Sequence, residues 1–278
     1  MKTKNIFYMT LSGLIITVLL LCSCNRVNKT GSLTWRVKEG TLTISGQGAM
    51  PNYSNGGTPW NSKWNYDSKE HYDITSIIIN EGVTNIGDYA FADCNDVVFV
   101  SMPNSVTIIG ESAFENCESI ISITLPANLT HIDKSAFAKC EKLTLIDIPD
   151  NVVNIGDLSF ERCFGLKSVS LGKKVAFIGC DAFEGCTNIQ SVTSTNPVPP
   201  ILETRVETKE ITVFNLDDSS KSETETRSND HSAFNSVAEN CRLIVPDEYI
   251  ATYKKDKEWN KFYTYYNKNK RTTRVVYM

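Results

Sequence analysis

A repeat of 23 residues runs through the middle of the chain and constrains its fold more than any other feature. Phenylalanine recurs five times at this interval, and cysteine follows three residues after each phenylalanine. The phenylalanines are Phe91, Phe114, Phe137, Phe160 and Phe183, and the cysteines are Cys94, Cys117, Cys140, Cys163 and Cys186. A single unit of this length cannot bury its own apolar face, whereas stacked units share a continuous core. The spacing therefore predicts a solenoid.

Each unit has the same internal order of residue types. An apolar strand, such as the one containing Ile146 and Ile148, ends at a proline, here Pro149, and an Ile-Gly turn precedes the next phenylalanine. The turn glycine is replaced once, by Asp133. Starting at residues 74–79, the pattern predicts six strands in register as far as Val192. At roughly 4.8 Å per strand the sheet would span on the order of 25 Å, so the solenoid is short.

This pattern resembles the BspA-like leucine-rich repeats of bacterial surface proteins, a class with 23-residue units. The resemblance implies a leucine-rich-repeat solenoid in which each coil has a strand and an irregular or helical return. It also implies caps: residues 33–35 and 40–50 resemble a β-rich lead-in, and residues 241–246 resemble a closing strand. Tyr249, Tyr253 and Trp259 follow at near-helical spacing, which predicts a helix that covers the last coil.

The first residues are predicted to be a bacterial lipoprotein signal. Lys2 and Lys4 precede an apolar run, and the run ends at Ser23 and Cys24, so Cys24 would carry the lipid after cleavage. An uncleaved anchor helix is the alternative. Loss of the two lysines changes the net charge from 28 − 32 = −4 to 26 − 32 = −6. This mildly acidic balance predicts no binding to nucleic acid.

The chain divides into six segments on these grounds. They are a signal peptide at 1–23, an anchor linker and β-rich cap at 24–72, the repeats at 73–196, a Pro-led acidic Ser/Thr-rich insertion at 197–230, the last repeat and cap helix at 231–267, and a basic tail at 268–278. Residues 203–230 carry eight acidic and four basic side chains, which favours a mobile loop or a hairpin arm. Either a binding role or a passive role fits it, and the tail is expected to be unstructured.

No catalytic or metal-binding constellation is evident. The repeated cysteines would lie in a row rather than converge on one point, so we interpret them as buried free thiols without a metal. Cys180 occupies a slot that is polar in other units, and we expect it to face solvent and to be oxidisable. The histidines, His71, His131 and His231, have no partner at a spacing typical of a dyad. The sequence therefore predicts a non-enzymatic protein that needs no cofactor.

The outer face of the sheet is the predicted binding surface. Strand alternation turns every second residue away from the core. The candidate residues are Ile78, Phe99, Ser101, Ser122, Thr124, Leu145, Asp147, Ser168 and Ser170. Most are short hydroxyl residues, interrupted by apolar ones, and such a face could accept a protein or an extended glycan.

A second candidate group is aromatic and precedes the first repeat strand. Trp60, Trp64 and Tyr66 could stack on sugar rings, or they could plug the open end of the solenoid. The two interpretations differ in whether the rings are exposed.

The family resemblance implies adhesion to host or neighbouring-cell macromolecules, with extracellular-matrix proteins as partners. Two alternatives stay open: a glycan-binding accessory protein of an uptake system, and a scaffold for another envelope protein. We expect a monomer anchored by lipid to the cell envelope, at the outer membrane. Residues 25–29 are basic rather than acidic, so both the surface and the periplasmic face remain open.

Overall fold

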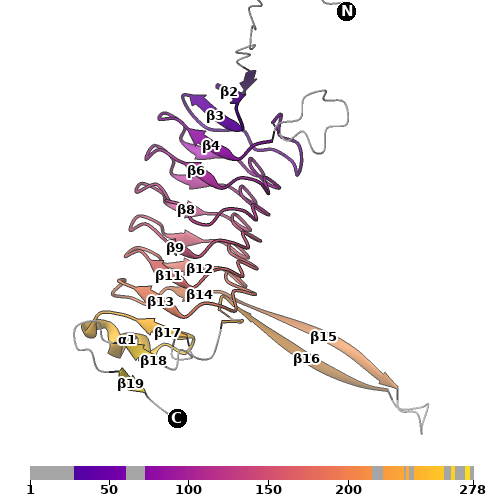
Figure 1. Cartoon of the computed structure of the whole chain (residues 1–278). Helices are drawn as coiled ribbons and strands as arrows, with labels where there is room; N and C mark the ends of the chain where they lie inside the picture. Colours follow the sequence, from indigo (N-terminus) through magenta and orange to yellow (C-terminus); the bar gives the residue numbers. More distant parts are fainter. Residues whose placement is uncertain are drawn as a thin grey trace, which may run out of the picture.

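The computed structural model describes residues 28–60, 73–214, 222–234, 236–237, 241–259, 264–266 and 273–275. The predicted signal, Cys24, Trp64 and Tyr66 lie outside these residues. The described chain forms an elongated stack of coils, with a two-stranded arm that projects from the stack near its C-terminal end (Figure 1). The leucine-rich-repeat solenoid expected from the 23-residue spacing is confirmed.

The N-terminal cap is continuous with the sheet of the solenoid. Strands β1 (Asn28–Thr30), β2 (Leu33–Lys38) and β3 (Thr41–Gly46) are antiparallel neighbours. Strand β3 then pairs in parallel with β4 (Ser76–Ile79), and β4 pairs with β6 (Phe99–Ser101). The lead-in therefore covers the first coil and also supplies its neighbouring strand.

The same face continues in a second ladder of parallel strands. These are β9 (Leu145–Asp147), β11 (Ser168–Leu171), β13 (Ser191–Ser194) and β17 (Arg242–Ile244). Residues 121–125, between β6 and β9, were expected to be a strand but form no ladder pairs. Ile123 and Leu125 are nevertheless only 7% exposed, so this coil keeps the inward alternation of its neighbours while the hydrogen-bonded sheet is divided there.

A second, narrow sheet lines the return side of the coils. Its parallel strands are β5 (Asn85–Ile86), β7 (Ile108–Ile109), β8 (His131–Ile132), β10 (Asn154–Ile155), β12 (Phe177–Ile178) and β14 (Ile201–Leu202). The isoleucine or leucine at each second position is buried. Turns follow each strand, so the return path is a short strand with turns and contains no helix within residues 73–202.

A column of stacked rings fills the core between the two sheets. Neighbouring phenylalanines from Phe91 to Phe183 have ring centroids 5.2–5.4 Å apart, and Phe234 of the last coil lies 4.8 Å from Phe183. Tryptophans close both ends, with Trp60 5.8 Å from Phe91 and Trp259 5.7 Å from Phe234. The repeated phenylalanine thus makes one continuous aromatic core.

The helix of the C-terminal cap is shorter than expected. A 3-10 turn, η1 (Asp247–Tyr249), leads into α1 (Ile250–Lys255), and the chain leaves helical geometry at Asp256. Strands β18 (Thr264–Tyr266) and β19 (Thr273–Val275) extend the β17 edge. The expectation of an unstructured tail is therefore wrong for Thr273–Val275. No helix in the described part of the chain has the length and apolarity needed to span a bilayer.

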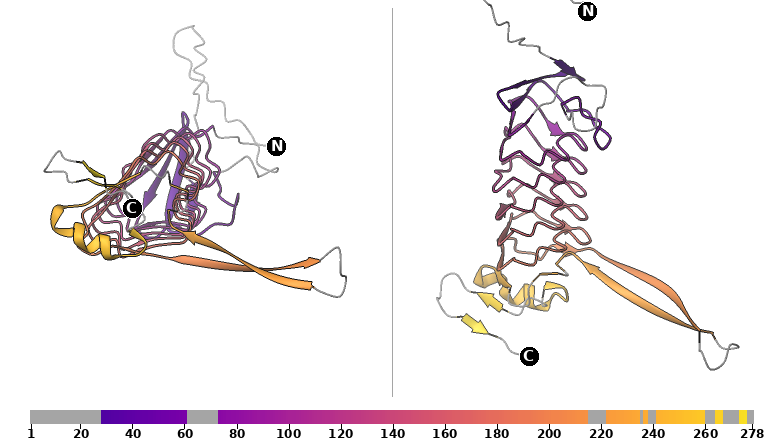
Figure 2. Two further views of the ribbon diagram at one scale, coloured as in Figure 1. Left: turned by 90° about the horizontal axis from the view of Figure 1, so that it is seen from below. Right: turned by 45° about the vertical axis from the view of Figure 1, so that its right-hand side comes forward.

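The insertion had been expected to form either a mobile loop or a hairpin arm, and it forms the hairpin. Strands β15 (Thr204–Phe214) and β16 (Ser222–Ser232) pair antiparallel through eleven residue pairs, from Thr204 with Ser232 to Phe214 with Ser222. Both strands point away from the solenoid in all views (Figures 1 and 2). We call this hairpin the arm.

Candidate functional site

The predicted outer-face residues do face away from the core. Along β9, Leu145 and Asp147 are exposed while Ile146 between them is buried, and the same alternation holds along β6 and β11. Exposure varies among the nine candidates: Phe99, Ser122, Thr124, Leu145 and Asp147 are exposed, whereas Ile78, Ser101, Ser168 and Ser170 are half-buried. The middle coils therefore present the most accessible part of this face.

Four exposed apolar side chains gather on those middle coils. Val98, Phe99, Ile121 and Leu145 are 52%, 54%, 55% and 42% exposed. Val98 and Ile121 occupy the same repeat position in adjacent coils, and Leu145 lies one coil further at the next position. Since neighbouring coils are about 4.8 Å apart, these residues are close neighbours on the surface. We call them the apolar patch.

Sequence reasoning identified only half of this patch. Phe99 and Leu145 belong to strands and follow the alternation rule, whereas Val98 and Ile121 stand just before the strand positions. A signal existed, because the equivalent position holds polar Thr75, Thr144 and Lys167 in other coils. Comparing columns at that position would have revealed two apolar residues in a polar column.

A groove borders the apolar patch where the ladder is interrupted. It has a volume of about 570 Å³ and lies between the coil of Ser122–Ala127 and the coil of Leu145–Asn151. Leu125, Leu145 and Ile148 supply apolar surface, and Thr124 and Asp147 supply polar atoms at the rim. We call it the sheet groove. Its lining offers an apolar contact surface with hydrogen-bonding groups at its margin.

Asp150, which lines the sheet groove, forms an ion pair with Lys173 of the next coil. The Lys173 ammonium donates to Asp150 Oδ2 at 2.6 Å, and the Lys173 backbone N–H donates to Asp150 Oδ1 at 3.2 Å. These hydrogen bonds lower the pKa of the Asp150 carboxyl and raise the pKa of Lys173. Both groups are largely exposed, so the pair contributes more to orientation than to stability.

Trp60 does not have the exposure that a sugar contact needs. Its side chain is 1% exposed, its indole N–H donates to the Ala90 carbonyl at 2.8 Å, and its ring packs against Trp35 and Tyr53 as well as Phe91. The glycan-contact interpretation is therefore wrong for Trp60, which plugs the N-terminal end of the core.

Four of the five repeated cysteines are buried, as expected, and their thiols have hydrogen-bond partners, whereas Cys94 is half-buried. The thiols of Cys117, Cys140, Cys163 and Cys186 donate to the carbonyls of Phe91, Phe114, Phe137 and Phe160 at 3.0–3.3 Å. Burial raises the pKa of Cys140 to about 12 and raises the pKa of Cys117 and Cys163 well above the ordinary value. Thiols held neutral in this way are inert as nucleophiles and metal ligands.

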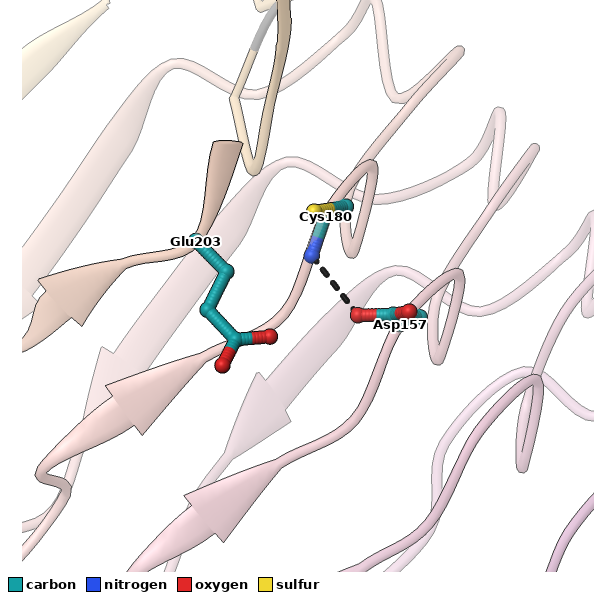
Figure 3. Close-up of side chains that lie close together, drawn as sticks. All are labelled: Asp157, Cys180 and Glu203. Carbon is teal, nitrogen blue, oxygen red and sulfur yellow. Dashed lines mark hydrogen bonds between the residues drawn. The ribbon is translucent and has the colours of Figure 1, made fainter. Parts of the chain in front are cut away.

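Cys180 is 7% exposed, so the expectation that it faces solvent is wrong. It belongs to a column at the turn that continues from Asp157 in the preceding coil to Glu203 in the next coil, and the three side chains lie close together (Figure 3). The Asp157 carboxylate accepts the Cys180 backbone N–H at 2.9 Å. The same arrangement occurs at Asp88, whose carboxylate accepts the Glu111 N–H at 2.9 Å. Asp157 thus has a structural role that the repeat reproduces.

The turn column is also where the described residues could supply metal ligands. One oxygen each of Asp157 and Glu203 and the Cys180 sulfur lie within 4.8 Å of one another. Asp157 and Glu203 line an open groove of about 410 Å³, together with Asp88, Glu111 and Asp133. Burial raises the pKa of Asp133, and the nearby carboxylates raise it further against the opposing effect of His131. Stacking of one repeat position accounts for the whole cluster.

Parallel coils of 23 residues, an inward aromatic column and a column of cysteines at the turns define a β-solenoid of the leucine-rich-repeat class. The family described as a BspA-type leucine-rich repeat region matches residues 66–243 in six copies. The chain belongs to this family. Among proteins with curated descriptions, none matches the sequence.

Solved structures of other leucine-rich-repeat proteins are similar to the chain. The T. pallidum leucine-rich repeat protein is 25% identical, with a TM-score of 0.44 over 60% of this chain and 71% of that chain. A leucine-rich cell surface protein of Faecalibacterium prausnitzii is 22% identical, with a TM-score of 0.42 over 81% and 72%. A leucine-rich repeat protein of Bacteroides ovatus is 16% identical, with a TM-score of 0.33 over 81% and 73%.

Proposed function

We propose that the protein is a non-enzymatic binding protein of the cell envelope that recognises a protein partner through the apolar patch and the adjoining sheet groove. The observation that carries this proposal is the exposure of Val98, Phe99, Ile121 and Leu145 together on the outer face of the sheet. Isolated exposed apolar residues need no explanation, whereas a contiguous group beside a groove is typical of an interaction site.

The chemistry of the patch favours a protein over a glycan. Sugar rings are usually held by flat aromatic faces, and three of the four patch residues are aliphatic. Two tryptophans were predicted to stack on sugars, and Trp60 is the one that lies within the described residues. Trp60 is buried in the core. Protein interfaces instead combine a desolvated apolar centre with a polar rim, which here is supplied by Thr124 and Asp147.

The location and the partner class extend the proposal. The basic start, apolar run and Ser23-Cys24 junction support lipid anchoring at Cys24. From the envelope the sheet face would engage an extracellular-matrix protein or another envelope protein, which is adhesion in the first case and assembly in the second. Protease treatment of intact cells tests the adhesion case, since a periplasmic chain is protected from the protease and could not contact a host surface.

The binding test uses charge placed in the apolar patch. The purified chain is measured against a panel of matrix proteins and of envelope proteins from the same cell. Phe99→Asp and Leu145→Lys should each lower the affinity for the partner at least about tenfold, which corresponds to about 1.4 kcal/mol of binding free energy. The matched control is Phe177→Asp, since Phe177 is 41% exposed but belongs to the second sheet. Unchanged binding in both patch variants would show that the sheet face is not the site.

A further inference from the structure

The arm is a two-stranded sheet with no further described strand on either side. Its strands β15 and β16 form a two-stranded sheet of their own, separate from the two sheets of the solenoid and from the lead-in. The views in Figures 1 and 2 show it standing clear of the coils along most of its length. A two-stranded ribbon that packs on nothing else is marginally stable in water. Each of its strands also has an outer edge whose backbone groups have no strand beside them within the described residues.

The two outer edges differ in how well they would accept another strand. In β15, seven of eleven residues are β-branched or aromatic, and two basic residues balance two acidic ones. In β16, two of eleven are β-branched, and three acidic residues stand against one arginine. The sequence TRVETKEITVF of β15 therefore has the stronger strand preference and no net charge. An incoming strand is favoured at the β15 edge.

From this edge we infer that two copies of the chain associate through their arms, β15 against β15, to form a four-stranded antiparallel sheet in the order β16-β15-β15-β16. A two-fold axis makes such an interface self-complementary, because each strand presents the same edge to the other. Projection from the solenoid leaves room for this pairing, since the arm reaches outward in every view. The monomer expected from the sequence would then be one half of the assembly.

The order of charges in β15 favours a register centred on Thr208 over its immediate neighbours; an axis through Val206 would also bring Arg205 opposite Glu207, but it aligns only residues 204–208 of the strand. When the axis passes through Thr208, Glu207 comes opposite Lys209 of the second copy, and the reverse pair forms by symmetry. Moving the axis by one residue to 207 or 209 places Glu207 opposite itself or Lys209 opposite itself. Opposite charges directly across a ladder stabilise it and like charges destabilise it. Pairing about Thr208 thus aligns residues 204–212 of both copies.

The first experiment measures the mass of the purified full chain by analytical ultracentrifugation over a wide range of concentration. The wild type should shift from monomer to dimer. Replacement of residues 204–232 by a short glycine-serine linker should abolish the shift. A wild type that stays monomeric at every concentration overturns the inference, and so does a linker variant that still dimerises, because another surface would then be responsible.

Charge exchange then tests the register. Glu207→Lys alone and Lys209→Glu alone each place like charges opposite each other, so each should be monomeric. The double variant E207K/K209E, and an equimolar mixture of the two single variants, should dimerise again. Lys209 pairs with Arg227 within the arm, so Lys209→Glu removes a like-charge pair there and would not be expected to unfold the hairpin.

The matched control is Glu210→Lys. It makes the same change of charge as Glu207→Lys, but position 210 comes opposite Val206 of the second copy, so dimerisation should persist. Single variants that dimerise like the wild type overturn the pairing about Thr208. Loss of the dimer in Glu210→Lys to the same extent as in Glu207→Lys has the same consequence, because net charge rather than register would then decide. Neither outcome bears on the apolar patch, which lies on a different part of the molecule.

Discussion

Replacing Phe137 by alanine removes the middle ring of the aromatic core. This ring is fully buried and stacks on Phe114 at 5.3 Å and on Phe160 at 5.4 Å, with interplanar angles of 1° and 8°. Truncation of a buried phenylalanine costs about 3–5 kcal/mol. Because rings on both sides lose a partner, we expect a loss near the upper end, about 5 kcal/mol, in the free energy of unfolding.

The leucine variant separates ring stacking from burial. Phe137→Leu keeps most of the apolar volume but loses two aromatic contacts, each worth about 0.5–1.5 kcal/mol, so the expected loss is about 1–3 kcal/mol. Urea denaturation followed by circular dichroism measures it. Solenoids can lose two-state behaviour, so tryptophan fluorescence, to which Trp60 and Trp259 at the two ends of the core contribute, checks that its transition coincides with that seen by circular dichroism.

A double-mutant cycle tests whether the stacking is local to neighbouring coils. Leucine at both Phe114 and Phe137 should give a coupling energy of about 0.5–1.5 kcal/mol, since their rings touch. Leucine at both Phe91 and Phe137, which are separated by Phe114, should be additive within about 0.5 kcal/mol. Equal coupling in the two pairs would refute the reasoning, because stability would then not be a sum of nearest-neighbour interfaces.

Three further predictions concern the thiols and the two caps. Above pH 9, Cys140 in the unfolded chain releases a proton that the folded thiol keeps until the pH approaches its pKa of about 12. The free energy of unfolding should therefore fall between pH 9 and pH 12. Urea midpoints should show a less steep fall in Cys140→Ala. Trp60→Ala should lower the free energy of unfolding by about 3–5 kcal/mol and leave partner binding by the folded protein unchanged. Tyr253→Phe removes the hydroxyl that contacts Ser194 Oγ at 2.7 Å and the Asn196 carbonyl at 3.1 Å, and thermal melts should show a loss of about 1–3 kcal/mol.

The inward residues of the coils could be predicted because the same apolar positions recur in five successive units of the repeat. A position that is apolar in every unit, such as that of Phe137, must face the shared core in every coil. The same logic failed for Cys180. Its column is polar elsewhere, but Cys180 is only 7% exposed, and Glu203 in the following coil comes from a part of the sequence where the repeat has already faded. Periodicity cannot indicate what covers the last regular coil.

The interruption at residues 121–125 was also beyond the reach of the pattern. Ile123 and Leu125 satisfy the inward positions as well as their equivalents in other coils do. Ladder pairing depends in addition on the spacing of backbone groups between coils, which residue types at one position do not record. The sheet groove opens beside this coil, so the part of the candidate site with the most room is the part that sequence alone could not place.

The division between inward and outward columns makes the binding proposal testable without ambiguity about folding. Inward positions such as Phe114 and Cys140 are fully buried, so a change there alters the interfaces between coils. Phe99 and Leu145 are about half exposed, and changes at exposed positions away from caps and cores usually alter stability by no more than about 0.5 kcal/mol. A charged residue at Phe99 that weakens binding tenfold while the unfolding midpoint stays fixed therefore reports on the partner contact itself. If the unfolding midpoint falls as well, the Phe99 side chain stabilises its coil. The patch must then be redefined around Ile121, which lies in the segment 121–125 that forms no ladder pairs.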